Sequence, residues 1–309
     1  MSKPRRMKRP IHGWLVLDKP LEITSNQALG VVKRALQPAK AGHAGTLDPL
    51  ATGLLPIALG EATKTVNAVM DGRKVYRFTV RWGVETTTDD TEGEVVETRA
   101  HRPDPANIQT ALPRFTGAIE QVPPAFSAIK VDGERAYDLA RDGEKVELKS
   151  RTVLIDRLSL LESPNQDTTV FEVECGKGTY VRSIARDLGR ELGCLGHVTE
   201  LRRLRVGPFG EADMVPLSAF QASNEAGQSP NWQDLVQHVR RIQDALGDMP
   251  RVTVGQQDVV TLKRGHTVLL RGRSAPVEAS QAYAVCGDQL LALGVVERGH
   301  FVPKRVFNL

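Results

Sequence analysis

The chain has 309 residues, of which 25% are charged and 40% are hydrophobic. This length accommodates one large domain or two ordinary ones, and the composition is typical of a soluble globular protein. The net charge of +4 and the pI of about 9.0 favour a polyanionic partner. No apolar run approaches the length of a membrane-spanning helix, and the run 14–17 is too short for a signal peptide.

The cysteines indicate the redox compartment, and the basic start of the chain indicates how it could contact a partner. Cys175, Cys194 and Cys286 are scattered and form no C-x-x-C pair, so we expect neither a disulfide framework nor a zinc site. A reducing cytoplasm fits this pattern. The first ten residues carry five basic side chains and no acid, which predicts a solvated tail or an arm that touches phosphate.

The first predicted elements are a strand over 13–17 and a helix that ends near Leu36. The strand is ended by the segment Asp18-Lys19-Pro20. Thr24 or Ser25 caps the helix, because a hydroxyl at that position accepts from the first free backbone N–H groups. Apolar residues then recur at helical spacing.

The stretch Gly42 to Pro56, GHAGTLDPLATGLLP, carries a single acid, Asp48. Glycines bracket it, and Pro49 biases the residue before it away from helical geometry. Asp48 is therefore expected on a stiff, non-helical turn that presents its carboxylate to a ligand. Taken alone, such a segment is more often a plain loop, and it is not a Walker loop because no Gly-Lys-Ser/Thr follows.

A helix over about 61–70 and an alternating strand over 74–82 are predicted next. Tyr76 opens the apolar face of this strand, and periodicity alone makes it a core aromatic. The polar segment 86–94 is predicted to be a turn. The acids at 89 and 90 indicate an acidic hairpin rather than a metal site, since no ligand set surrounds them.

The second half contains a charged insertion and further regular elements. The segment 122–152 is rich in Pro, Gly and charge, which favours a mobile insertion. The polar stretch 223–231 suggests a domain boundary. The other predicted elements are a helix starting at Asp104-Pro105, strands over 152–161 and 169–175, helices over 180–192 and 232–246, and short strands over 251–309.

Three strings in this chain resemble one enzyme family. They are the Gly42–Pro56 stretch, CGKGTYVRSIARDLG beginning at Cys175, and GHVTELRRLRV beginning at Gly196. All three are similar to motifs of the TruB family of pseudouridine synthases, which modify uridine 55 in the T-loop of tRNA. Ala44 stands where the family usually has Thr, and Phe126 where it often has Tyr.

The resemblance implies an α+β fold, with a mixed, largely antiparallel sheet, flanking helices and a small C-terminal PUA-like β-barrel. It implies a catalytic domain over 1–250, in which 122–152 is a thumb-like RNA-binding insertion, and an RNA-binding domain over 251–309. It implies catalytic roles for Asp48, Arg182 and Tyr76. The substrate-binding residues that it implies are His43, Tyr76, Tyr180, Leu201 and Lys19.

The chemistry of the implied reaction suits these residue types. Moving a uracil from an N-glycosidic to a carbon bond needs no redox step, so no cofactor or metal is expected. A carboxylate with a reference pKa of about 3.9 can serve as nucleophile or stabilising anion, and a paired arginine keeps it ionised when buried. Whether Asp48 attacks C1′ of the ribose or C6 of the base stays open. His43 is expected to fill the space left by the flipped uridine, and Tyr76 to stack on that base.

Some of these residues have plainer interpretations, and three functions remain in view. Without the family, Arg182 is a solvated helix charge, His43 a structural histidine, and the arginines of 202–205 a basic surface. A monomeric tRNA uridine-55 pseudouridine synthase acting on the T-arm is favoured. The alternatives are an RNA-binding or tRNA-folding protein on the same scaffold, and a guide-RNA-dependent pseudouridine synthase.

Overall fold

The computed structural model describes residues 8–127, 130–131, 134–135, 148–221, 231–272 and 275–309. Residues 1–7 of the basic N-terminal arm therefore lie outside the described residues. So do most of the predicted 122–152 insertion and most of the predicted boundary at 223–231.

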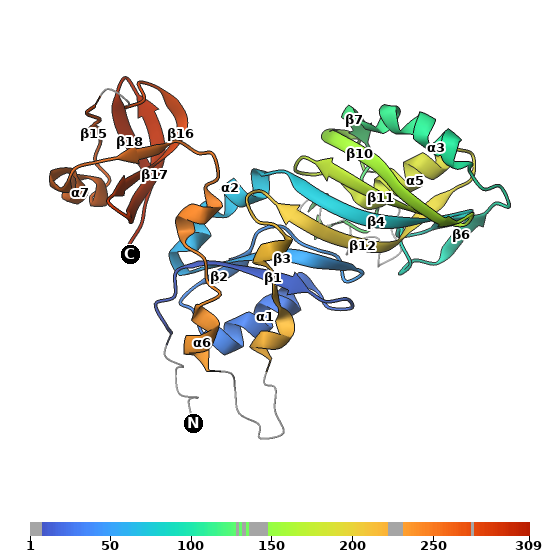
Figure 1. Ribbon diagram of the computed structural model, residues 1–309, viewed down its shortest axis with the longest axis horizontal. Helices are drawn as coiled ribbons and strands as arrows, with labels where there is room; N and C mark the ends of the chain where they lie inside the picture. The colour runs from blue at the N-terminus through green and yellow to red at the C-terminus, as the bar shows by residue number, and fades with distance from the viewer. Residues whose placement is uncertain (1–7, 128–129, 132–133, 136–147, 222–230, 273–274) are drawn as a thin grey trace.

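In the described ranges, nine strands form one mixed sheet with the order β13-β1-β3-β12-β4-β11-β10-β7, with β2 paired to β3 (Figure 1). Neighbours are antiparallel except the parallel pairs β1–β13 and β3–β12. The strands are β1 (Gly13–Lys19), β2 (Ala41–His43), β3 (Ala51–Leu59), β4 (Lys74–Trp82), β7 (Gly117–Gln121), β10 (Arg151–Asn165), β11 (Thr168–Cys175), β12 (Gly196–Val206) and β13 (Val215–Pro216). Short hairpins pair β5 (Val84–Thr86) with β6 (Val95–Thr98) and β8 (Lys130–Val131) with β9 (Glu134–Arg135).

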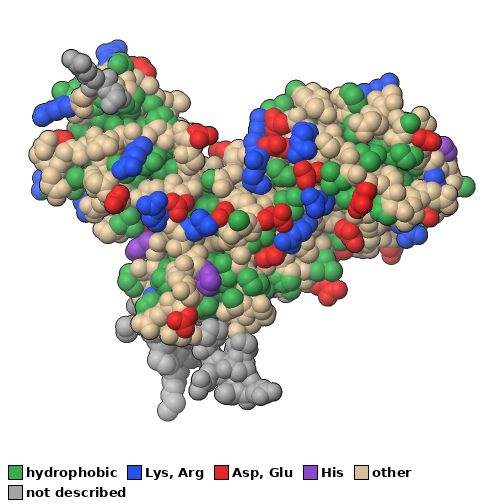
Figure 2. Space-filling view, viewed as in Figure 1, with side chains coloured by type: hydrophobic (Ala, Val, Ile, Leu, Met, Phe, Trp, Pro, Cys, Tyr) green, Lys and Arg blue, Asp and Glu red, His purple; other side chains and the backbone are tan. Residues whose placement is uncertain are grey.

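Alternation of side chains gives β4 one apolar and one charged face, whereas β1 and β3 are buried along nearly their whole length. On β4, Phe78, Val80 and Trp82 are buried, whereas Arg77 and Arg81 are exposed. The charged face is covered by ion pairs between strands, including Arg77 and Arg157 with Glu172. Figure 2 shows basic and acidic side chains interspersed over the central strands of this sheet. The basic side chains of this face are therefore paired with acids and do not form a purely basic patch.

Four helices share one core cluster with the main sheet, namely α1, α3, α5 and α6, whereas α2 belongs to a second cluster and α7 packs on the small C-terminal sheet. α1 begins with a capping box between Thr24 and Gln27, which decides between the two predicted caps, Thr24 and Ser25, in favour of Thr24. The helices are α1 (Ser25–Leu36), α2 (Val66–Asp71), α3 (Pro105–Ala111), α5 (Val181–Glu191), α6 (Trp232–Val236) and α7 (Gln256–Lys263). Short 3-10 turns are η1 (Gly60–Thr65), η2 (Leu112–Phe115), η3 (Glu211–Asp213), η4 (Leu217–Phe220) and η5 (Ile242–Ala245).

Two predicted helices are partly wrong. The segment 61–70 starts as the 3-10 turn η1 and becomes α-helical only at Val66. The helix predicted over 232–246 ends at Val236. The reason is a pair of hydrogen bonds between the backbones of Trp14 and Arg240, which extend the edge of β1 and are incompatible with a continuous helix.

The C-terminal region forms a five-stranded sheet with the order β14-β16-β17-β18-β15. Its strands are β14 (Arg251–Thr253), β15 (Val268–Leu269), β16 (Ala279–Cys286), β17 (Gln289–Glu297) and β18 (His300–Val306). The sequence predicts only short strands here, and it misses α7. Figure 1 shows this sheet as a separate lobe, reached through the segment after α6.

The two lobes share a hydrophobic core. Phe307 is fully buried and follows the last strand of the small sheet. It belongs to a cluster whose members from both lobes include Trp14, Ala44, Val69, Phe209, Ile242, Val285 and Leu290. Lys64 of η1 also bonds the Val306 carbonyl at 2.7 Å. The small sheet is therefore packed onto the main one.

Candidate active site

Asp48 lies in the loop between β2 and β3. The loop is non-helical, as expected, and Gly45 adopts the left-handed φ of +98° that glycine tolerates. Ser25, the first residue of α1, fixes the backbone of this loop. Its hydroxyl accepts a hydrogen bond from Leu47 N at 2.8 Å and donates one to Leu47 O at 3.0 Å. The Asp48 side chain is 38% exposed. The carboxylate is thus fixed on a rigid turn and open to a ligand.

Arg203 anchors the same loop from β12. Its guanidinium donates to Leu54 O at 2.8 Å, Gly45 O at 3.0 Å and Thr46 O at 3.4 Å, and the residue is 2% exposed. The interpretation of 202–205 as a basic surface is therefore wrong for Arg203. Its neighbours are tied to acids, Arg202 to Asp18 at 3.0 Å and Arg205 to Glu174.

Arg182 holds the Asp48 carboxylate. Its Nη2 lies 2.8 Å from Asp48 Oδ2, and its side chain is only 5% exposed. The same guanidinium donates to Thr88 O at 2.9 Å and to Phe126 O at 3.0 Å. Because these contacts fix its plane, Arg182 presents a preoriented positive charge to Asp48. It is not the solvated helix charge that its sequence position suggests.

Asp90 is a second acid beside Arg182 that the sequence analysis missed. Its Oδ2 lies 3.3 Å from Arg182 Nη1, and the residue is fully buried. The predicted hairpin is present as β5–β6, but its acids at 89 and 90 point inward instead of into solvent. The hydroxyl of Thr88 donates to Asp90 Oδ1, which holds the acid in place. The local sequence pattern around Asp90 did not indicate this contact with Arg182.

His43, Tyr76 and Leu201 come from the strands that surround the loop. His43 ends β2, and its Nδ1 is buried without a hydrogen-bond partner among the described residues. Half-buried Tyr76 lies opposite Arg203 in the β4–β12 register. Burial raises the pKa of Tyr76, so its hydroxyl stays neutral at pH 7. Leu201, 8% exposed, pairs with both Ala51 and Phe78. These side chains lie on strands adjoining the Asp48 loop.

Lys19 lies against the Asp48 loop, and Tyr180 lies at the start of α5. Lys19 is fully buried, and its ammonium donates to the carbonyls of Pro20, Ile23 and Pro49 at 2.9, 2.8 and 3.3 Å. Burial lowers its pKa to about 8. Its position supports the loop at Pro49, and the charge of Asp48 acts on its ammonium. Tyr180 stands directly before α5 and is half-buried, with the Arg151 guanidinium 4.9 Å from its ring centroid.

The sequence matches models of one family over most of this region. Residues 33–181 match the model described as TruB family pseudouridylate synthase (N terminal domain). Residues 182–246 match tRNA pseudouridylate synthase B C-terminal domain. The tRNA pseudouridine synthase B of Rhodopseudomonas palustris is 56% identical, with 100% of this chain and 84% of that protein covered. The chain belongs to the TruB family. The tRNA pseudouridine synthase B of Agrobacterium fabrum is 54% identical over the whole length of both chains.

Solved structures confirm the fold expected for a TruB family member. One chain of an H/ACA RNP bound to a substrate RNA containing 2′-deoxyuridine superposes with a TM-score of 0.71 at 24% identity, covering 96% of this chain and 86% of that one. A chain of a Cbf5-Nop10-Gar1 complex gives a TM-score of 0.70 at 24% identity, covering 100% and 90%. The predicted α+β pseudouridine synthase fold is therefore correct.

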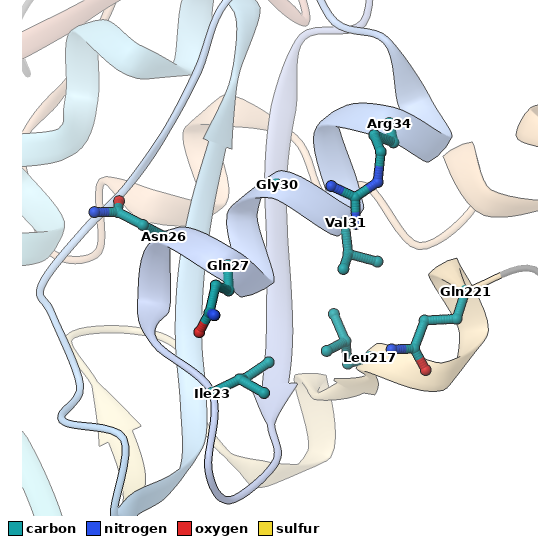
Figure 3. Close-up of a pocket in the computed structure, with 8 residues that line it drawn as sticks. All are labelled: Ile23, Asn26, Gln27, Gly30, Val31, Arg34, Leu217 and Gln221. Carbon is teal, nitrogen blue, oxygen red and sulfur yellow. The ribbon is translucent and has the colours of Figure 1, made fainter.

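A groove of about 440 Å³ lies between α1 and η4, apart from the predicted site residues. Figure 3 shows Val31 of α1, Leu217 of η4 and Ile23 of the segment before α1 directed into it. None of the site residues predicted from the resemblance to the TruB family lines this groove.

Among the residues that the structure describes, no cluster of three His, Cys, Asp or Glu side chains could hold a metal. No described helix is long and apolar enough to cross a membrane.

His43 is expected to be neutral at pH 7. Burial lowers its pKa below the ordinary 6.5, and the Arg203 charge lowers it further. A neutral ring is better suited to enter a base stack, because it carries no charge to be desolvated. An NMR titration of the imidazole carbons, assigned with His43→Gln, should give a midpoint below 6.5. A midpoint above that value would contradict the burial seen here.

Proposed function

We propose that this protein isomerises uridine 55 in the T-loop of tRNA to pseudouridine, with Asp48 as the catalytic nucleophile. The observation that carries the proposal is the ion pair of 2.8 Å between Asp48 and Arg182, at the centre of the motif shared with the TruB family. The family and the relatives named tRNA pseudouridine synthase B support the substrate class. The T-arm and the position of the uridine are part of the proposal.

The geometry suits the bond changes of this isomerisation. The N1–C1′ bond breaks, the uracil turns, and a C5–C1′ bond forms. The proton on C5 is lost and a proton is gained at N1, so the reaction is balanced without a further reactant. A carboxylate held by Arg182 can attack either C1′ or C6. Tyr76 and Leu201 would hold the detached base beside it.

We propose that different parts of the chain have different roles in this reaction. Residues 1–250 carry the chemistry, 122–152 close over the RNA, and 251–309 bind RNA. The shared core around Phe307 supports a fixed relation of the two lobes, so that one tRNA contacts both. We propose a monomer that acts in the cytoplasm, and the free state of all three cysteines supports a reducing compartment.

Release of tritium tests the function directly. An unmodified tRNA transcript with uridine tritiated at C5 should lose one tritium per molecule when it is incubated with the purified protein. A transcript with cytidine at position 55 should show no release from that site. Binding without release would favour the RNA-binding or tRNA-folding alternative. Release that depends on an added guide RNA would favour the guide-dependent one.

His43 and Tyr76 should respond differently to the structure of the substrate. If His43 fills the vacated stack, His43→Ala should slow the reaction on a folded T-arm more than on an unstructured oligonucleotide, whose uridine is already unstacked. If Tyr76 holds the flipped base, Tyr76→Ala should cost about 1–3 kcal/mol on both substrates. Single-turnover rates on the two RNAs measure this. Equal ratios for the two variants would refute the division of roles.

A further inference from the structure

Three arginines on α5 form a ladder of ion pairs with the β5–β6 hairpin. Arg182, Arg186 and Arg190 are spaced four residues apart, so they share one face of the helix. Arg182 pairs with Asp90 at 3.3 Å. Arg186 pairs with Asp89 at 2.9 Å, and Arg190 with Glu85 at 2.7 Å. The exposed fraction of the arginine side chain rises along the ladder from 5% through 9% to 53%.

The middle pair joins the same two segments that Arg182 joins. Arg186 contacts Asp89 in the loop before β6, and its Nη2 donates to Val122 O at 2.8 Å. Arg182 contacts Thr88 in that loop and Phe126 in the segment that follows β7. The two arginines therefore hold the 88–90 loop and the 122–126 segment at two successive turns of α5. Displacing the contacts of one arginine would therefore move the segments that the other arginine contacts.

Asp89 lies at a tight point of the loop between β5 and β6. Its φ is +60°, in the left-handed region that Asp enters more readily than most residues other than glycine. The residue is 6% exposed, and its carbonyl accepts from Val198 N at 3.0 Å. Burial raises the pKa of Asp89 to about 6, in spite of the facing Arg186 and Arg182. An ionised buried acid needs its arginine partner.

We propose that Arg186 and Asp89 are a positioning pair for the reaction. Together they fix the 88–90 loop and the 122–126 segment so that Arg182 keeps its guanidinium on the Asp48 carboxylate. Neither residue touches the reacting atoms. This role rests on the proposed isomerisation at Asp48 and adds a second buried ion pair to the machinery behind it.

The variants Arg186→Gln and Asp89→Asn, and the double variant, test the pair. Each single variant should lower the single-turnover rate at saturating tRNA by about 10- to 100-fold, because small misplacements of a positioned group cost rates of this order. The Kd for tRNA should stay within about twofold, since rate and affinity respond to different contacts. The double variant should be no slower than the slower single variant, because one interaction is lost in all three.

The outer pair provides the matched control. Arg190→Gln and Glu85→Gln remove an ion pair of the same ladder whose arginine is largely exposed, and should change the rate by less than about twofold. Arg186→Lys keeps the charge beside Asp89 and should recover part of the rate.

A merely structural role makes different predictions. Lower thermal stability of Arg186→Gln with an unchanged rate well below its melting temperature would overturn the proposal. Additive losses in the double variant, or a loss in Kd alone, would also overturn it. If the wild-type protein releases no tritium, the proposed function fails first, and that result is separate from any difference among the variants.

Discussion

Asp48→Asn is expected to lower the single-turnover rate of isomerisation by at least about 1,000-fold, which corresponds to about 4 kcal/mol. The amide keeps the shape of the side chain but supplies neither an anion nor a nucleophile. Arg182 keeps a charged partner in Asp90, so removing one of its two acids does not leave a buried charge unpaired. The fold and the Kd for tRNA should therefore be preserved. Tritium release and a filter-binding titration measure the two quantities.

Asp71→Asn is the matched control for this variant. Asp71 forms an exposed ion pair with Lys177 at 2.8 Å, and its loss should leave both rate and stability close to those of the wild type. Turnover retained in Asp48→Asn would refute the assignment of the nucleophile. A parallel loss of tRNA affinity would show that the carboxylate acts mainly in binding.

The elements that the sequence predicted well are set by local chemistry. α1 begins where Thr24 caps it, and α3 begins where Asp104 and Pro105 dictate. β4 follows from strict alternation, because one face of the strand is buried and the other is charged. Asp48 was placed on a turn by Pro49 and the neighbouring glycines. These signals act within a few residues, so a single sequence contains them.

The elements that the sequence missed depend on partners far along the chain. The helix predicted over 232–246 is interrupted because Arg240 pairs with Trp14, more than 200 residues away. Asp90 seemed to belong to a solvated turn, and it is buried only because α5 brings Arg182 to it. Local pattern could not reveal either contact. Family resemblance pointed to Arg182 and Asp48, but it did not show the second acid or the ladder along α5.

Arg203 shows the same limit in its strongest form. The string of arginines at 202–205 looks like a basic surface, yet Arg203 donates to the buried carbonyl of Leu54 and to the partly buried carbonyls of Gly45 and Thr46. Arg203→Met keeps much of the stem but leaves these acceptors without a donor. We expect the free energy of unfolding to fall by about 3–5 kcal/mol, since each unsatisfied buried group costs about 1–3 kcal/mol.

Urea denaturation of Arg203→Met measures this loss, and Arg202→Met is its control. Arg202 is 37% exposed and pairs with Asp18 and Glu211, so its removal should cost less than about 1 kcal/mol. The pKa of His43 should also rise in Arg203→Met, because the Arg203 charge lowers it in the wild type. If Arg203→Met were as stable as Arg202→Met and lost only salt-dependent affinity for tRNA, Arg203 would be a phosphate contact instead of the anchor of the Asp48 loop.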